Sequence, residues 1–128
     1  MTAPLPTDTK VLAGAFAASG LFHLIKPEVF TPIIPAPLRG RDRELVIVSG
    51  LAELACAVGL AVERTRPLAG LASAALLVAV FPANVQMSLD AAASARRRPS
   101  AGRVGLLAVT LARLPLQWSM IRAALRAR

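Results

Sequence analysis

A long apolar run that carries one central carboxylate constrains this chain more than any other feature. Residues 44–62 read ELVIVSGLAELACAVGLAV, without proline and with Glu53 as the only charge beyond the first position. A helix of this length spans about 28 Å, close to the roughly 30 Å hydrocarbon core of a bilayer. A carboxylate at the centre of such a span costs at least about 2.5–3.5 kcal/mol to insert. Glu53 is therefore expected to have a polar or charged partner, or a functional role.

The composition favours a membrane protein. The 128 residues are 55% hydrophobic and 17% charged, whereas soluble domains carry about 25% charge. The net charge of +8 arises from 15 Lys and Arg against 7 Asp and Glu. Because the arginines stand in short clusters between apolar runs, we assign them to the lipid bilayer and its anionic headgroups, and expect no nucleic-acid partner.

Three further apolar runs predict an all-α fold, a four-helix transmembrane bundle with up-down-up-down topology. We expect a single membrane domain, residues 1–128, with helices near 9–26, 44–62, 67–89 and 103–125. Connections this short place successive helices antiparallel. Pro82 should kink the third helix and free the carbonyl of Val78. Small residues four apart are expected to permit close helix approach: Gly14/Ala18, Ala55/Gly59 and Gly70/Ala74.

Two other interpretations of these runs exist. A soluble helical bundle needs polar outer faces, and residues 68–89 offer none. In the first run, Ala15-Phe16-Ala17 resembles a signal-peptide cleavage site, although only Lys10 is basic before it. We therefore expect a multi-pass membrane protein.

The connections on one side of the bundle are proline-rich or basic. Residues 27–43 contain four prolines among apolar residues, which predicts an extended strip at the membrane interface or a lid over the bundle; a plain connector is the alternative. Residues 90–103 are expected to form a solvated basic loop. Eight basic residues on this side against six on the other favour a cytoplasmic position for loops 27–43 and 90–103. The eight are Lys26, Arg39, Arg41, Arg43, Arg96, Arg97, Arg98 and Arg103, and the six are Lys10, Arg64, Arg66, Arg122, Arg126 and Arg128.

Two opposite charges are expected to lie at the same depth in the membrane. Glu53 follows Glu44 by nine residues and Arg113 follows Arg103 by ten, which gives depths of about 13.5 Å and about 15 Å. A Glu53–Arg113 ion pair, direct or bridged by one water, would remove the largest insertion cost from both helices.

Further polar residues are expected to extend this pair into a pocket. Ser49 shares a helix face with Glu53, and Gln117 shares one with Arg113. Asn84 and His23 lie toward the proline-rich side. We therefore predict an intramembrane polar pair and pocket formed by Glu53, Arg113, Asn84, His23, Gln117 and Ser49, with interhelical hydrogen bonding as the plainer interpretation of each single residue. One His and one Cys supply no metal or haem ligand set, so no metal site is predicted.

Several short stretches resemble the DoxX-like family of small four-helix bacterial membrane proteins. They are SGLFHLIKPEVF (19–30), VSGLAELACAVGL (48–60), RTRPLAG (64–70), FPANVQM (81–87) and RLPLQW (113–118). The resemblance covers nearly the whole chain in the same order. It implies the bacterial cytoplasmic (inner) membrane and a link to quinol-oxidising or oxidative-stress systems, although the lone Cys56 argues against a dithiol role.

Two classes of function follow from these features. One is a non-catalytic subunit or accessory protein of a redox-linked membrane assembly, with other membrane or redox proteins as partners and with an oligomer left open. The other is a binder of a small amphiphile, such as a quinone or lipid, in the polar pocket; a quinone is the one cofactor suggested. Catalysis is the third and least supported class, because no nucleophile and base stand at helical spacing. No catalytic residue is therefore predicted.

Overall fold

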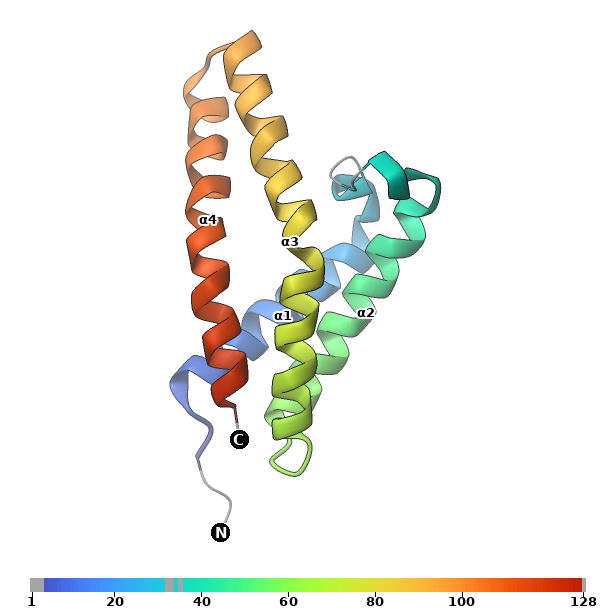
Figure 1. Cartoon of the computed structure of the whole chain (residues 1–128), viewed down its shortest axis with the longest axis vertical. Coiled ribbons are helices and arrows are strands. Elements are labelled where there is room, and N and C mark those ends of the chain that lie inside the picture. The colour runs from blue at the N-terminus through green and yellow to red at the C-terminus, as the bar shows by residue number, and fades with distance from the viewer. Residues whose placement is uncertain (1–3, 32–33, 35, 128) are drawn as a thin grey trace.

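The computed structural model describes residues 4–31, 34 and 36–127, and this part of the chain is all-helical (Figure 1). The described residues form four α-helices and no strand: α1 (Thr7–Ile25), α2 (Asp42–Ala61), α3 (Arg66–Arg97) and α4 (Ala101–Arg126). Two short 3-10 helices, η1 (Pro27–Val29) and η3 (Ala36–Arg41), lie between α1 and α2. The prediction of an all-α protein with four helices is confirmed.

Local sequence signals explain most helix ends. Pro27 follows the last residues of α1, and Pro67 stands in the first turn of α3, where its missing N–H costs nothing. The Ser100 side chain caps α4 by accepting a hydrogen bond from the Arg103 backbone N–H at 3.2 Å. The buried Arg66 side chain donates from Nε to the Leu60 carbonyl at 2.9 Å and so satisfies the last turn of α2.

The predicted basic loop over residues 90–103 is wrong. α3 continues to Arg97, and only residues 98–100 separate it from α4. The segment after Asp90 is rich in alanine, the strongest helix former. Gln86 also donates to Asp90 Oδ1 at 2.9 Å, one turn away. The charged residues from Asp90 onward end the apolar run, but α3 continues through them.

The proline-rich segment is folded where an extended strip was expected. Both η1 and η3 are helical turns, so the extended conformation is wrong for the described residues of 27–43. Phe30 and Ile34 form a small apolar cluster with Val46 near the start of α2. Pro32, Ile33 and Pro35 lie outside the described residues. The described part of the segment therefore folds back onto α2.

The helices are arranged as two close pairs (Figure 1). α3 packs along α4, α1 packs against α2, and α2 also packs on α3, whereas α1 and α4 touch only lightly. α3 changes direction near its middle, where Pro82 stands, and the α3–α4 pair extends beyond η1 and η3. The N- and C-terminal ends of the chain lie at the same end of the molecule in this view.

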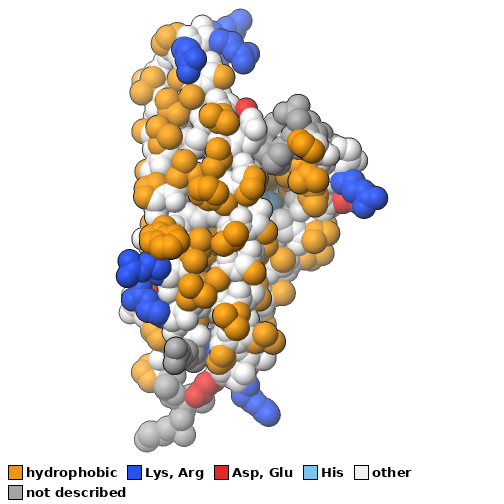
Figure 2. All heavy atoms as spheres, in the orientation of Figure 1, with side chains coloured by type: hydrophobic (Ala, Val, Ile, Leu, Met, Phe, Trp, Pro, Cys, Tyr) orange, Lys and Arg blue, Asp and Glu red, His pale blue; other side chains and the backbone are white. Residues whose placement is uncertain are grey.

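The outer surface is strongly apolar. Large hydrophobic side chains are exposed on all four helices, among them Val11 at 67%, Leu68 at 71% and Trp118 at 64%. Figure 2 shows such side chains spread over one face, with Lys and Arg gathered in groups at its margins. Within the described residues three helices are long and apolar enough to cross a membrane, α2, α3 and α4. α1, which carries Asp8, Lys10 and His23, is not among them.

Glycines allow some of the helices to approach closely, though not all of those predicted. A Cβ added to Gly59 would lie 2.7 Å from the Ala69 Cβ, and one added to Gly70 would meet the Ala124 carbonyl oxygen. Gly14, by contrast, has nothing within 4 Å of an added Cβ, so its predicted role in helix packing is wrong. The contact that matters for the polar site was not predicted and lies between Gly20 and Gly50.

Candidate functional site

Glu53 is buried in the middle of α2 and is held by two residues of α1. The residue is 6% exposed. Its Oε1 accepts a hydrogen bond from the Ser19 hydroxyl at 3.2 Å, and its Oε2 lies 3.3 Å from His23 Nδ1. The carboxylate thus finds its partners on the neighbouring helix, which reduces the cost of placing it at this depth.

His23 is oriented by its own helix and by the proline-rich segment. Its Nδ1 lies 2.6 Å from the Ser19 carbonyl oxygen. Because a carbonyl can only accept, Nδ1 carries the proton and donates it. The imidazole ring also stacks on the Phe30 ring, with centroids 3.9 Å apart and planes 10° apart. The Nδ1–H of His23 is therefore directed at the Ser19 carbonyl of its own helix, and the Nδ1 atom lies 3.3 Å from Glu53 Oε2.

The contact between α1 and α2 depends on two glycines. A Cβ on Gly20 would lie 2.7 Å from the Gly50 carbonyl oxygen, and a Cβ on Gly50 would lie 2.7 Å from the His23 Cβ. Neither position has room for a side chain. This close approach places Ser19 and His23 opposite Glu53, one turn after Gly50.

The predicted Glu53–Arg113 ion pair does not form directly, whereas the form bridged by one water stays a prediction. Among the described residues, no direct ion pair or hydrogen bond joins the two side chains, and the polar contacts of Glu53 are with Ser19 and His23. Arg113 nevertheless faces the same space, because Glu53 and Arg113 line two pockets in common. The matched depth of Glu53 and Arg113 correctly predicted that they face the same space. Depth alone does not give the rotation of each helix about its axis, which decides the hydrogen-bond partners.

Asn84 and Gln117 join α3 to α4. Asn84 Nδ2 donates to Gln117 Oε1 at 2.6 Å, and Gln117 Nε2 donates to the Leu77 carbonyl oxygen. Both side chains are buried. Pro82 was expected to free the carbonyl of Val78. The carbonyl that accepts the bond from Gln117 belongs to Leu77, one residue earlier. Asn84 and Gln117 therefore connect helices as well as line the pocket.

Two pockets meet at the polar residues. The larger has a volume of about 470 Å³ and is lined by side chains from all four helices. The smaller, of about 50 Å³, lies toward the proline-rich segment and is lined by His23, Phe30, Ser49, Glu53, Asn84 and Arg113, with Val80, Ala83 and Met87. Because Glu53, Asn84 and Arg113 line both, they stand at the boundary between the pockets.

The structure brings all six predicted residues to these two pockets. His23 and Ser49 line the smaller, Gln117 lines the larger, and Glu53, Asn84 and Arg113 line both. Sequence reasoning missed the hydrogen bond from Ser19 to Glu53 and the stacking of Phe30 on His23. The four-residue spacing of Ser19 and His23 pointed to a shared face, but nothing in the sequence indicated which helix that face meets.

The remaining walls of the larger pocket are apolar. Phe16, Leu77, Val109, Leu116 and Met120 contribute to them. A neighbouring groove of about 360 Å³ shares Ala15, Leu116 and Met120 with this pocket and runs on between α1 and α4. The site thus combines charged and amide groups at one end with an apolar groove at the other. Within the described residues, no group of three or more His, Cys, Asp or Glu side chains could hold a metal ion.

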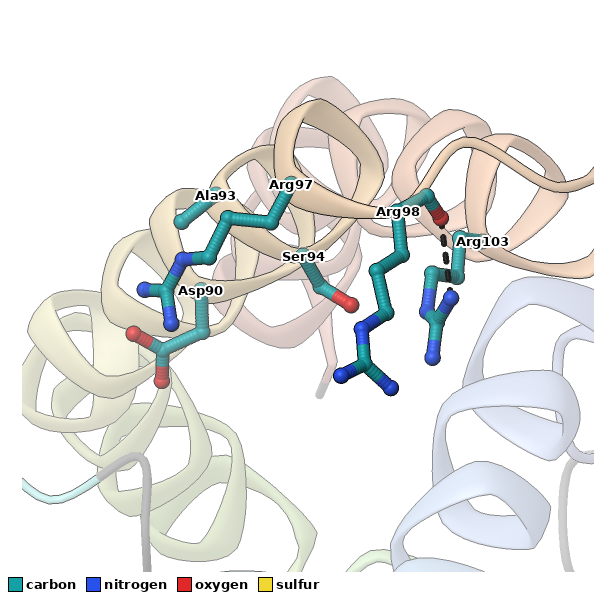
Figure 3. A pocket seen from close by; sticks show the side chains of 6 residues that line it. All are labelled: Asp90, Ala93, Ser94, Arg97, Arg98 and Arg103. Atoms are coloured by element: carbon teal, nitrogen blue, oxygen red, sulfur yellow. Dashed lines mark hydrogen bonds between the residues drawn. The ribbon is translucent and has the colours of Figure 1, made fainter.

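A separate hollow lies at the turn between α3 and α4 (Figure 3). It has a volume of about 500 Å³ and is lined by Asp90, Ala93, Ser94, Arg97, Arg98 and Arg103. The Arg98 and Arg103 side chains extend in the same direction, and Arg103 Nη1 donates to the Arg98 carbonyl at 2.9 Å. These arginines suit anionic headgroups, and their hollow shares no lining residue with the two pockets of the polar site.

Fold and site together define the class of this protein. It is an all-helical protein with three helices able to cross a membrane and a polar pocket at its centre. The chain belongs to the family described as Domain of unknown function (DUF8561), which matches residues 12–128. No curated protein and no solved structure matches the chain.

Proposed function

We propose that this protein is a multi-pass membrane protein that binds a small amphiphile, such as a quinone or lipid, in its central pocket. The observation that carries the proposal is the shape and chemistry of that pocket. Its volume of about 470 Å³ falls within the range of about 300–1,000 Å³ typical of small-molecule sites. Polar groups converge at one end, and apolar side chains line the rest.

Access from the lipid phase supports a hydrophobic ligand. α1 and α4 touch only lightly, and the groove between them continues from the pocket along about two turns of each helix. Val109 and Leu116, which line the pocket, are also exposed at 66% and 57%. If the apolar surface is in lipid, a ligand can reach the pocket sideways from the bilayer without crossing water.

We further propose that all four helices cross the membrane as an up-down-up-down bundle. Three of them have the required length and apolarity. α1 packs against α2 and contributes Ser19 and His23, which make the polar contacts of Glu53. The resemblance to DoxX-like proteins supports a bacterial cytoplasmic membrane and a redox-linked assembly, in which an amphiphile such as a quinone would have a role.

Mass spectrometry of the protein purified in mild detergent tests this function. The expected result is a co-purifying amphiphile that is lost when Ala112→Trp fills the pocket. Ala108→Trp is the matched control, because Ala108 lies one turn earlier on α4, is exposed and does not line the pocket. It should retain the ligand. A preparation with no ligand and a stoichiometric protein partner would instead favour the accessory-subunit function.

A further inference from the structure

We propose that the hollow at the α3–α4 turn binds the phosphate group of an anionic phospholipid through the side chains of Arg98 and Arg103. This site is separate from the central pocket. The inference rests on insertion of α3 and α4 in a membrane, and not on the amphiphile binding proposed above. It follows from the charges in the hollow, the arrangement of its side chains and its position along the two helices.

The hollow carries an excess of positive charge. Three arginines and one aspartate line it, which gives a net charge of +2. The Arg97 side chain extends toward Asp90, whose Oδ1 also accepts a hydrogen bond from Gln86 (Figure 3). Within the described part of the chain, neither Arg98 nor Arg103 forms an ion pair. Two positive charges are therefore left without a negative partner, and a bound anion would offset the repulsion between them.

Arg98 and Arg103 present their guanidinium groups on the same side of the turn. Both side chains extend in the same direction, and the Ser94 side chain lies beside that of Arg98 (Figure 3). Arg103 Nη1 donates to the Arg98 carbonyl oxygen at 2.9 Å, whereas the Arg98 guanidinium and the Ser94 hydroxyl make no hydrogen bond to a described residue. Guanidinium N–H groups donate in a planar fork that matches phosphate oxygens, and the hydroxyl can donate as well.

The hollow lies where lipid head groups are expected. Asp90 ends the apolar run of α3, and Arg97 follows it by seven residues, or about 10.5 Å of helix. The head-group layer extends about 5–7 Å beyond each face of the hydrocarbon core. Leu89 and Val104, which adjoin Asp90 and Arg103 in the sequence, are 59% and 54% exposed. A lipid phosphate can therefore reach the hollow while its acyl chains lie on apolar surface, which a free phosphate would not use.

Competition between two lipids with the same acyl chains tests the head group. Purified protein in mild detergent is mixed with equal amounts of palmitoyl-oleoyl phosphatidylglycerol and palmitoyl-oleoyl phosphatidylcholine, and bound lipid is measured by native mass spectrometry. Phosphatidylglycerol is expected to bind at least about fivefold more tightly, because the arginines repel the choline ammonium of its competitor. Equal binding of the two lipids would overturn the inference.

Inorganic phosphate distinguishes a lipid from a free anion. Added in excess over the lipid, it should not displace phosphatidylglycerol, because it makes no contact with the apolar surface beside the hollow. If inorganic phosphate displaces the lipid, the hollow is a site for free phosphate and the assignment to a phospholipid is overturned.

Arginine variants test the location of the bound lipid. Arg98→Gln should weaken phosphatidylglycerol binding by at least about tenfold, because a charge-assisted hydrogen bond is lost. Arg96→Gln is the matched control, because Arg96 is also exposed near the end of α3 but does not line the hollow. Its effect should be at most about fivefold, the contribution of a basic residue near an anionic surface. Equal effects of the two substitutions would leave only general attraction and overturn the site.

Two further variants complete the test. Arg103→Gln should weaken binding as Arg98→Gln does, and it serves in its place if Arg98→Gln does not fold. Ala112→Trp, which fills the central pocket, should leave the preference for phosphatidylglycerol unchanged. Loss of the preference in Ala112→Trp would place the lipid in the central pocket and overturn the inference. Absence of the preference in the wild type would leave amphiphile binding in the central pocket standing, so the two proposals fail separately.

Discussion

Among single residues, Glu53 shows how a membrane-depth carboxylate can be accommodated without a direct arginine partner. The Ser19 hydroxyl donates to Glu53 Oε1 and His23 Nδ1 lies 3.3 Å from Oε2, and both residues come from one turn of α1. Arg113 faces the same pockets but leaves its guanidinium available. The carboxylate therefore has a structural partner on one side and space for a ligand on the other. If Glu53 served only to hold α1 and α2 together, no pocket beside its side chain would be required.

The first prediction separates the two partners of Glu53 by double-mutant cycles. His23→Phe keeps a ring to stack on Phe30 but removes the Nδ1–H, and Glu53→Gln removes the charge. We expect a coupling energy of about 0.5–3 kcal/mol between these substitutions, as for residues in contact. The measurement is unfolding of the detergent-solubilised protein by heat or denaturant.

The matched cycle combines Glu53→Gln with Arg113→Gln. We expect a smaller coupling there, because no direct bond joins the side chains. A larger coupling for the arginine cycle than for the histidine cycle would show that Glu53 pairs with Arg113, contrary to the observed contacts.

Between elements, the crossing of α1 over α2 decides whether the site forms at all. Gly20 and Gly50 approach so closely that neither tolerates a Cβ without movement of the backbone or of His23. Helix interfaces in membranes commonly use small residues in this way, because close backbone approach increases van der Waals contact. Here the approach also sets the distance between Glu53 and its donors.

The second prediction compares two glycine substitutions of the same type. Gly50→Ala should destabilise the protein by about 1–3 kcal/mol, as overpacking does elsewhere. Gly14→Ala, in open space on α1, should be neutral or stabilise by up to about 1 kcal/mol through higher helix propensity. Thermal unfolding in detergent measures both. Equal effects would contradict the close contact at Gly50.

Some features of the fold could be predicted from the sequence and others could not, because each sequence pattern reports a different physical property. Apolar runs and prolines located the four helices, because length and apolarity reflect the bilayer and proline disrupts backbone hydrogen bonding. They did not locate the end of α3, because Asp90–Arg97 is polar enough to leave a membrane and alanine-rich enough to remain helical. Glycine spacing identified Gly59 and Gly70 but also Gly14, since spacing does not show which face meets a neighbour.

The candidate site was predictable in its members but not in its bonds. Counting residues from the helix ends predicted one depth for Glu53 and Arg113, and the two residues line the same pockets. The choice of His23 as the partner depends on helix rotation and on the Gly20–Gly50 crossing, which one sequence does not report. The stacking of Phe30 depends on the fold of the proline-rich segment, whose prolines only exclude regular helix.

For the whole molecule, the number of helices that cross the bilayer depends on α1. α3 has 32 residues and is therefore about 48 Å long, so a core of about 30 Å requires it to tilt or to project. Projection or tilt would bring the arginines at the α3–α4 turn to the headgroups. α2 and α4 are long and apolar enough to span beside it. α1 is the helix that decides the topology.

The third prediction concerns the positions of the two termini. If α1 crosses with the other three helices, tags on the N- and C-terminal ends lie on the same side of the membrane. If only α2, α3 and α4 cross, the tags lie on opposite sides. We expect the same side, because α1 supplies Ser19 and His23 to a carboxylate in the middle of α2, and a helix lying at the surface could not reach that depth.

The basic residues at the η1–η3 and α3–α4 ends further predict that those connections face the cytoplasm, so that both tags lie outside it. Protease protection of single tags in inverted and right-side-out vesicles measures both positions. Opposite tags would overturn the four-span topology, and two cytoplasmic tags would keep it but reverse the orientation.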